Sequence, residues 1–518
     1  MGIIFLLTHL NKLTKVSLVS NIYLLIFLPL ISSLFCQIFG KRGVSFLIAI
    51  TACVALFFMI IRIFPDILIY EKVSNDFELS PLSLALEFRL DILGAAFLLL
   101  AVFLKIVILF FYASDIKKFL NERNDRIFYS VFLLQLFGLV GIFTTNNLLN
   151  LFLFFEIYAF SFFATISISR DNNLLKLSFR YFCLNAVSSL LTLFCILVIY
   201  LTFDEVRIDR ISENLSMLSG SQAWFVITIS LLLIASLITK FFPFWLYFEK
   251  LKSDSLIANF LTIESLFIKT IVGIFLVVKF TYFFGYSMLF DRFWFMEISI
   301  LIAASLIVYS SFKICKQKHL KIIATYLCLN NLGFIILCLA LYSLDSLRAM
   351  FFYLLNFSLV NLLIFIFSTF LKRYYHTSAL SKIFLIKQDH FSLVLPLKFL
   401  TFAIVAFPMT ILFFANWYFA QASIGFGPRS SLLIFVVIAN FSYMVLVIRL
   451  ISVFFAEKPA ERNELRQVGF KKYQYLVSFW FLIMAIYTIS LASGQVNNVS
   501  DKFAHYLLLD PTSKKFNP

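Results

Sequence analysis

The sequence contains few charged residues for its length. Only 14% of the 518 residues are Asp, Glu, Lys or Arg, whereas 62% are hydrophobic. Ordinary soluble domains are about a quarter charged, so this composition excludes a typical water-soluble fold and indicates a polytopic membrane protein. The 43 Lys and Arg exceed the 27 Asp and Glu. Because these basic residues fall in short loops between apolar runs, they report membrane orientation, and we expect no nucleic-acid partner.

Residues that build metal, redox and nucleotide sites are also scarce. The seven cysteines lie in or beside apolar segments without C-x-x-C spacing, and the five histidines are scattered. This spacing argues against a zinc, haem or iron-sulfur centre and against a disulfide framework. The run Gly40–Gly43 (GKRG) lacks the spacing of a phosphate-binding loop. We therefore predict no metal, no cofactor and no catalytic residue in this chain.

Long apolar runs make up most of the sequence. A helix of about 20 apolar residues crosses the hydrocarbon core of a bilayer. The segments that fit this template number about fourteen. They are 20–39, 44–64, 88–112, 127–145, 147–169, 178–203, 223–246, 256–283, 294–313, 320–343, 347–371, 395–421, 431–455 and 472–494. No stretch between them is long enough for a separate soluble domain, so residues 1–518 are predicted to form a single membrane domain.

The loop charges predict an orientation. One of the two alternating sets of loops holds most of the loop lysines and arginines, for example Lys372 and Arg373. Basic loops stay on the cytoplasmic side. We therefore predict a multi-pass protein of the bacterial inner membrane with both termini on the periplasmic side. The alternative is the mitochondrial inner membrane, where the matrix takes the place of the cytoplasm.

Ionisable side chains inside the spans are rare. Glu156 lies seven residues into the apolar run 150–169 (NLFLFFEIYAFSFFATISIS). An ionisable residue at such a position is costly and usually marks a functional site. Further candidates for buried charges are Lys105, Lys240, Glu264, Lys269, Lys279 and Lys321. Of these, Lys279 and Lys321 lie near helix ends, where a lysine can snorkel to the membrane interface.

Two prolines predict interrupted helices. Pro243 follows Lys240 by three residues in ITKFFPFW, and Pro408 precedes the polar Asn416 in FPMTILFFANWYFA. Proline removes a backbone hydrogen bond, and transporters often place ion sites where a membrane helix is interrupted. The two breaks lie five spans apart, which predicts two repeats of about five helices. The predicted parts are three N-terminal helices at 20–112, the repeats at 127–283 and 294–455, and a last helix and tail at 472–518.

Charge placement suggests a proton relay. A carboxylate near a buried lysine favours its charged form, so moving the carboxylate switches the lysine between holding and releasing a proton. We predict that Glu156 and Lys240 form such a gate and that Lys269 is the next station. Polar residues that could hold water beyond it are Tyr326, Asn330, Asn331, Ser358 and Asn361. The alternative is static: the buried Glu and Lys neutralise each other and keep helices in register without transport.

Four ordered motifs carry a family resemblance. They are NNLLNLFLFFEIYAFSFFATISIS with Glu156, SLITKFFPFWLYFEK with Lys240 and Pro243, FLTIESLFIKTIVGIFLVVK with Lys269, and HLKIIATYLCLNNLGFIILCLAL with Lys321. Together they resemble the antiporter-like membrane subunits of complex I (bacterial chains L, M and N; mitochondrial chains 2, 4 and 5) and of Mrp-type cation/proton antiporters.

The resemblance implies a fold and a pathway. The fold is an all-α polytopic membrane protein of about 14 transmembrane helices, with two inverted five-helix repeats and broken seventh and twelfth helices. The pathway runs through Glu156, Lys240, Lys269 and Lys321 to the twelfth helix, where the family carries a lysine. This sequence has Asn416 there, and an asparagine can hydrogen-bond water but cannot carry charge.

The predicted function is proton translocation, with Na⁺ or K⁺ as candidate counter-ions, by one member of a hetero-oligomeric complex in the lipid bilayer. Proline, threonine and Trp-Tyr in the twelfth span resemble the Mrp D type of antiporter chain. One alternative is a proton-pumping membrane component of NADH-quinone oxidoreductase (complex I), since NIYLLIFLPLISSLFCQIFGKRG resembles the start of chain 5. Any redox chemistry would then belong to partner subunits. Another alternative is a scaffold homologue without transport, for which Asn416 is the argument.

Overall fold

The computed structural model describes most of the chain. The described residues are 22–41, 43–70, 72–77, 86–119, 122–168, 172–215, 221–241, 256–283, 293–375, 379–380, 394–425, 427–455 and 472–508. The chain divides into two compact units, which we call the first unit (Met1–Leu289 with Leu509–Pro518) and the second unit (Phe290–Leu508). This division falls between the two predicted five-helix repeats. Pro243 lies outside the described residues.

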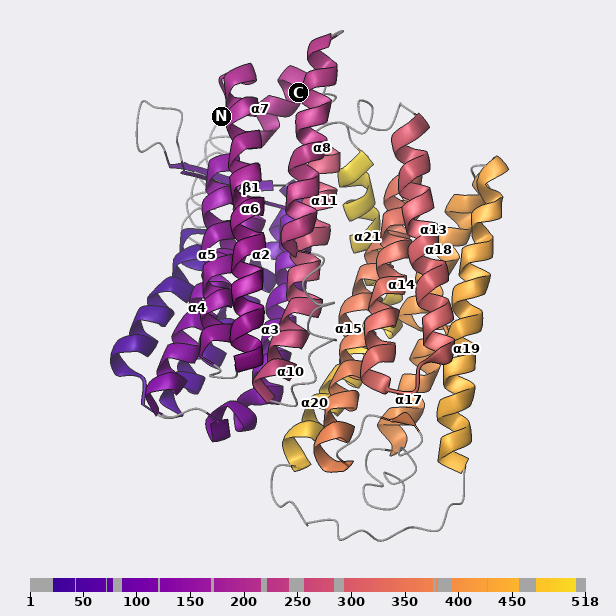
Figure 1. The fold of residues 1–518 in the computed structure, drawn as a ribbon. Coiled ribbons are helices and arrows are strands. Elements are labelled where there is room, and N and C mark those ends of the chain that lie inside the picture. The colour runs from indigo at the N-terminus through magenta and orange to yellow at the C-terminus, as the bar shows by residue number, and fades with distance from the viewer. Residues whose placement is uncertain are drawn as a thin grey trace, which may run out of the picture. The chain divides into compact units, whose positions relative to one another are not determined.

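The apolar runs of the first unit form helices, beginning with Ile22–Phe39 (Figure 1). The others are α2 (Val44–Tyr70), α3 (Ile92–Phe119), α4 (Glu122–Thr144), α5 (Leu148–Ser167), α6 (Asn172–Phe203), α7 (Ile208–Leu215), α8 (Ser221–Phe241), α10 (Leu256–Ile263) and α11 (Thr270–Phe283). A π-helix, η1 (Glu264–Lys269), joins α10 to α11. Between α2 and α3, strands β1 (Lys72–Phe77) and β2 (Leu86–Asp91) pair antiparallel, with Lys72 opposite Asp91.

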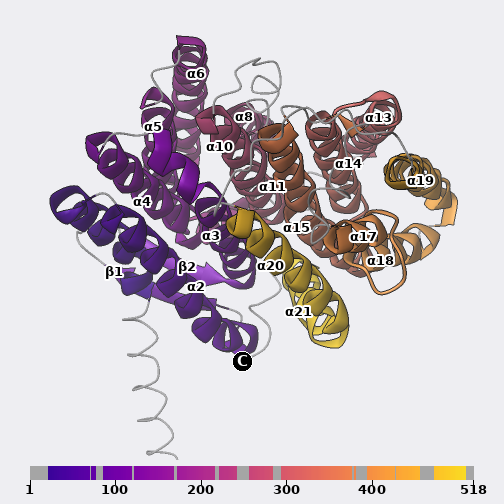
Figure 2. The same cartoon turned by 90° about the horizontal axis from the view of Figure 1, so that it is seen from below.

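Close packing fixes the position of α5. In the end-on view of Figure 2, α4 packs against α3 and α5. A Cβ atom on Gly138 would lie 2.9 Å from the backbone nitrogen of Tyr158, and one on Gly141 would clash with the ring of Phe154. Asn147 caps the start of α5 by accepting two backbone N–H groups of its first turn. These contacts hold the helix that carries Glu156 directly against α4.

The second unit is built around a buried helix. Its elements are α13 (Phe293–Lys316), α14 (Leu320–Leu341), α15 (Leu344–Tyr375), α17 (Val394–Ile404), α18 (Ile411–Gly425), η4 (Gly427–Leu432), α19 (Leu433–Phe455), α20 (Lys472–Leu491) and α21 (Ser493–Leu508). The helix α15 packs against α14, α18 and α21, and its most apolar stretch is fully buried. Polar side chains within that stretch therefore have protein, not solvent, around them.

The twelfth predicted span is interrupted around Pro408. The helix α17 ends at Ile404, and α18 begins at Ile411. In between, Ala406 and Met409 have positive φ angles of 57° and 69°, a conformation that side-chain-bearing residues seldom adopt. The chain therefore leaves the helical conformation here, and some of its backbone groups lie outside the helical hydrogen-bond pattern.

The predicted all-α polytopic membrane fold is confirmed. Among the described residues, eleven helices are long and apolar enough to cross a membrane. The number becomes twelve if Val477–Leu491 and Ser493–Leu508, bent by 77°, form one span. Two shorter apolar helices, Thr228–Lys240 and Leu395–Ile404, lie in the predicted seventh and twelfth spans. The count of about fourteen and the five-helix repeats stay predictions.

Candidate charge relay in the membrane helices

Glu156 on α5 and Lys240 on α8 form an ion pair. The Lys240 Nζ lies 2.6 Å from the Glu156 Oε1, and the lysine and glutamate side chains are 1% and 18% exposed, respectively. Lys240 is the last residue but one of α8, and a cation is favoured at the C-terminal end of a helix. The structure thus brings together the two residues that the sequence predicted as a gate.

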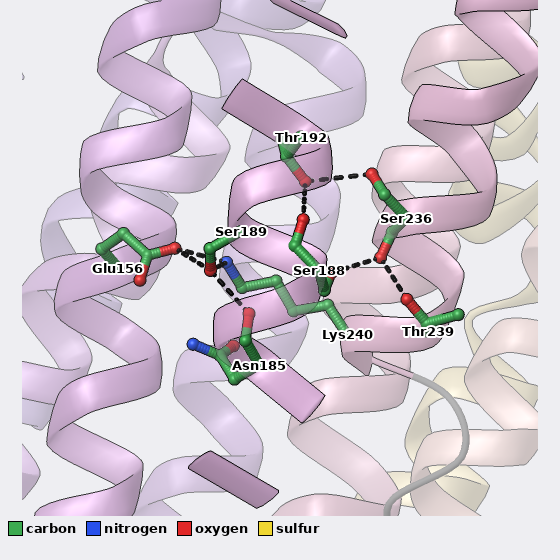
Figure 3. Close-up of polar contacts among 8 residues, drawn as sticks. All are labelled: Glu156, Asn185, Ser188, Ser189, Thr192, Ser236, Thr239 and Lys240. Carbon is green, nitrogen blue, oxygen red and sulfur yellow. Dashed lines mark hydrogen bonds and ion pairs between the residues drawn. The ribbon is translucent and has the colours of Figure 1, made fainter. Parts of the chain in front are cut away.

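The hydroxyl of Ser189 on α6 joins this pair (Figure 3). Its Oγ lies 2.6 Å from the Glu156 Oε1 and accepts a hydrogen bond of 3.1 Å from the Lys240 Nζ. The same Oγ lies 2.8 Å from the backbone carbonyl of Asn185. Because a serine hydroxyl has one proton to donate, it can point to the carboxylate or to the carbonyl. Ser189 can therefore adjust to the charge on either partner.

Hydroxyl groups also fix the last turns of α8 against α6. The Ser188 hydroxyl donates to the carbonyl of Ser236 at 2.6 Å, and the Thr192 and Ser236 hydroxyls are 2.9 Å apart. The Thr239 hydroxyl donates to the same Ser236 carbonyl at 2.7 Å (Figure 3). This carbonyl belongs to the residue four before Lys240. The contacts therefore hold the lysine where it reaches across α6 to Glu156.

Lys269 lies at the end of η1 and is buried, with 1% of its surface exposed. Its Nζ lies 3.5 Å from the ring centroid of Phe162 on α5 and 3.8 Å from that of Tyr181 on α6. The faces of aromatic rings attract a cation. The predicted second station therefore lies against two aromatic rings on the same two helices that carry Glu156 and Ser189.

Lys279 is buried, so the suggestion that it snorkels to the interface is wrong. Only 2% of it is exposed. Its Nζ donates a hydrogen bond of 2.6 Å to the carbonyl of Thr145, which follows the last residue of α4. The last carbonyls of a helix lack partners within it, and a lysine can satisfy them. Lys279 thus caps α4 from α11.

Two further buried charges pair with each other. Lys105 on α3 forms an ion pair with Glu264 on η1, and the two side chains are 0% and 1% exposed. The Lys105 Nζ also donates to the Oε1 of Gln135 on α4 at 2.6 Å and lies 4.5 Å from the ring centroid of Phe132. The sequence predicts that both charges are buried but assigns a partner to neither.

In the second unit, Lys321 is the second residue of α14. It is half-buried, and its Nζ lies 5.7 Å from the ring centroid of Phe365 on α15. Asn416 on α18 accepts a hydrogen bond of 2.7 Å from the Tyr353 hydroxyl and donates one of 3.2 Å to the side-chain carbonyl of Asn440. The amide that replaces the expected lysine is therefore hydrogen-bonded to neutral groups on α15 and α19.

Asn330 is the centre of another polar cluster. It is fully buried and accepts a hydrogen bond of 2.6 Å from the Tyr443 hydroxyl. Its amide nitrogen lies 3.0 Å from the Ser310 hydroxyl and 2.9 Å from that of Ser311. The cluster joins α13, α14 and α19 through neutral groups. Of the other predicted relay residues, Asn331 accepts a hydrogen bond of 3.4 Å from Asn356, and the Ser358 hydroxyl donates within its own helix.

The sequence profile of the family described as NADH:quinone oxidoreductase/Mrp antiporter, transmembrane, matches residues 145–444. The match covers more than half of the chain. The chain belongs to this family. The matched range contains every predicted relay residue from Glu156 to Asn416, but not Lys105. A comparison with curated proteins finds no match.

Solved structures share the fold of this antiporter-family chain. A chain of the Mrp complex from Dietzia sp. DQ12-45-1b is similar at 14% identity with a TM-score of 0.79, over 96% of this chain and 98% of that one. A chain of the membrane-bound sulfane sulfur reductase, an archaeal respiratory membrane complex, is similar at 20% identity with a TM-score of 0.75, over 95% of this chain and 98% of that one. A chain of respiratory complex I from Thermus thermophilus with bound NADH is similar at 16% identity with a TM-score of 0.72, over 94% of this chain and 99% of that one.

Two polar contributors to the site of this antiporter-family protein were missed in the sequence. Ser189 bridges the Glu156 pair, and Gln135 accepts a hydrogen bond from Lys105. Each is a polar residue within an apolar span, and that position was the available signal. Serine, however, often hydrogen-bonds to its own helix backbone. Composition alone therefore does not distinguish a bridging serine from a helix-bonded one.

Proposed function

We propose that this chain translocates protons as the antiporter-like member of a hetero-oligomeric membrane complex, of the Mrp D type, with Na⁺ or K⁺ as candidate counter-ions. The observation that carries the proposal is the 2.6 Å contact between the Lys240 Nζ and the Glu156 Oε1 inside the membrane helices. Buried ionisable groups of this kind usually serve ion pathways. Ser189 can donate to the carboxylate or to Asn185, so the site has two hydrogen-bonding states.

The proposed pathway has five stations and two helix breaks. When the ion pair separates, Lys240 releases its proton toward the amine of Lys269, which lies against the rings of Phe162 and Tyr181. The proposed pathway continues in the second unit. The stations in order are Glu156, Lys240, Lys269, Lys321 and Asn416. Pro243 and Pro408 are the proposed helix breaks, which free backbone carbonyls for water or ions.

The proposed setting is a bacterial inner membrane, with both termini on the periplasmic side and other membrane proteins of the same complex as partners. The three structural neighbours come from multisubunit membrane complexes. The alternative assembly is complex I in a bacterial or mitochondrial inner membrane. Purification of the native complex distinguishes the two assemblies: flavin and iron-sulfur subunits would identify complex I, and small hydrophobic subunits alone would identify an Mrp-type complex.

The direct test is proton flux in sealed vesicles that contain the native complex. Glu156→Gln and Lys240→Ala should each reduce flux to the background of vesicles without the complex, because the gate needs both charges. The matched control is Lys318→Gln, which removes an exposed lysine outside the proposed pathway. Wild-type flux in both gate variants would contradict the proposal and would favour the static interpretation of the pair.

The scaffold alternative has its own test at Asn416. Its amide is hydrogen-bonded to Tyr353 and Asn440, so transport beyond this point depends on neutral groups. Asn416→Lys introduces the charge that the family carries at this place. Increased flux would show a relay that is weakened at its far end. No flux in either the wild type or the variant would identify a scaffold and would contradict transport.

A further inference from the structure

A second ion pair lies apart from the proposed gate. It joins Lys105 on α3 to Glu264 on η1, and both side chains are almost completely buried. Lys105 has a second acceptor in the Gln135 Oε1 at 2.6 Å. The ammonium group thus has two oxygen partners from two different elements. Lys105 therefore keeps one hydrogen-bond acceptor, Gln135, if Glu264 turns away.

Glu264 retains capacity for another donor. One of its oxygens faces Lys105, whereas the other, Oε2, is buried and has no hydrogen-bond partner among the described residues. A buried carboxylate oxygen without a donor costs free energy, and native proteins rarely leave one. A second donor within reach of Glu264 would therefore be used.

The π-helix brings such a donor near. Residues five apart in an α-helix point about 140° away from each other. In the i→i+5 pattern of a π-helix they lie on the same side, and such turns are frequent at functional sites. Glu264 and Lys269 are the first and last residues of η1. They interact electrostatically, so Glu264 interacts with two lysines, as the ion-pair partner of Lys105 and as the charge that acts on Lys269.

We propose that Glu264 is a switching carboxylate that alternates between Lys105 and Lys269. While it pairs with Lys105, the Lys269 amine rests against the rings of Phe162 and Tyr181. When it turns to Lys269, it stabilises the ammonium form of that lysine. The inference rests on the proposed function, because it assigns a regulator to one station of the relay.

The proton balance of the switch is simple. Lys269 accepts one proton from the Lys240 side as Glu264 turns toward it. Lys269 passes the same proton onward as Glu264 returns to Lys105. Lys105 keeps its proton throughout, held by Gln135 while the carboxylate is away. Lys105 and Glu264 are therefore positioning residues, and they add α3 to a pathway that otherwise lies within the matched family region.

Exchange of the two charges, Lys105→Glu together with Glu264→Lys, tests the switch in the native complex in sealed vesicles. A static link survives the exchange, because opposite charges still join α3 to η1. A switch does not survive, because the amine at position 264 repels Lys269. We expect a normal amount of assembled complex and proton flux reduced at least about 10-fold. Flux above half of the wild-type value would overturn the proposal.

A second variant decides the question if the exchanged pair does not assemble. The neutral pair, Lys105→Met together with Glu264→Gln, keeps similar volume, and buried ion pairs often tolerate such replacement without loss of stability. We again expect assembly with flux reduced at least about 10-fold. Retained flux in this variant would overturn the switch, since a structural link alone would have been replaced successfully.

Infrared difference spectroscopy provides a readout that a structural role would not change. The carboxylate band that Glu264→Gln removes should shift when the pH of the purified complex is changed, and should not shift in Lys269→Met. An unchanged band in the wild type would overturn the proposal. Glu156→Gln separates the two hypotheses: flux that this variant abolishes and the charge exchange preserves would contradict only the switch. Absence of flux in the wild type would contradict proton transport itself.

Discussion

The first unit pairs buried charges, as in Glu156 with Lys240 and Lys105 with Glu264, whereas the polar clusters around Asn330 and Asn416 in the second unit join amides to hydroxyls. A charged pair changes its energy when one partner gains or loses a proton, because a buried charge without its partner is costly. An amide keeps its charge state and can only reorient its hydrogen bonds. The first unit therefore contains groups that can hold or release a proton, whereas these clusters of the second unit can only rearrange their hydrogen bonds.

The largest effect on stability should come from breaking the charged pair on one side only. Glu264→Gln leaves the buried Lys105 without its carboxylate, and we expect the free energy of unfolding to fall by about 3 kcal/mol. Thermal denaturation of the purified complex would measure the loss. The neutral double variant with Lys105→Met is the control and should recover most of it. Equal stability of the single and double variants would contradict this account of the first unit.

A neutral cluster should respond less to the loss of one partner. Tyr443→Phe removes the hydroxyl that donates to the buried Asn330 oxygen, so we expect a loss of about 1–3 kcal/mol in the same measurement. A matched control is Tyr309→Phe, which keeps its ring contact with Tyr326 at an exposed site and should have little effect. A loss larger than that of Glu264→Gln would reverse the contrast between the units.

The smallest of these effects should appear at Ser189. Ser189→Ala removes a hydrogen-bond partner of Glu156 and Lys240 but leaves their 2.6 Å contact. One such bond contributes about 1 kcal/mol, so we expect flux in vesicles to fall about fivefold without complete loss. Ser189→Thr keeps a hydroxyl and serves as the control. Complete loss in Ser189→Ala would mean that the hydroxyl carries the proton itself.

The features of this structure that follow from the cost of burying charge could be predicted from the sequence. Long apolar runs predicted membrane helices, and the isolated charge of Glu156 predicted a partner, which is Lys240. Pro408 predicted the interruption between α17 and α18, because the constraint is local to the residue.

Long-range pairing could not be predicted in the same way. Several lysines were available to Glu264, and only the arrangement of helices selects Lys105. Lys279 near a helix end resembled a snorkelling residue, but its acceptor is a backbone carbonyl on another helix. The π-helix around Lys269 depends on packing that the local sequence does not specify. Each of these features is set by tertiary contacts.

The helix η1 would also make the proposed relay sensitive to helical winding. If its six residues adopted α-helical geometry, Lys269 would turn about 140° away from the direction of Glu264. The direction of Lys269 relative to Glu264 thus depends on how tightly the chain is wound between α10 and α11. A rotation of α10 about its own axis would therefore bring Glu264 and Lys269 together or move them apart, without translation of any helix through the membrane.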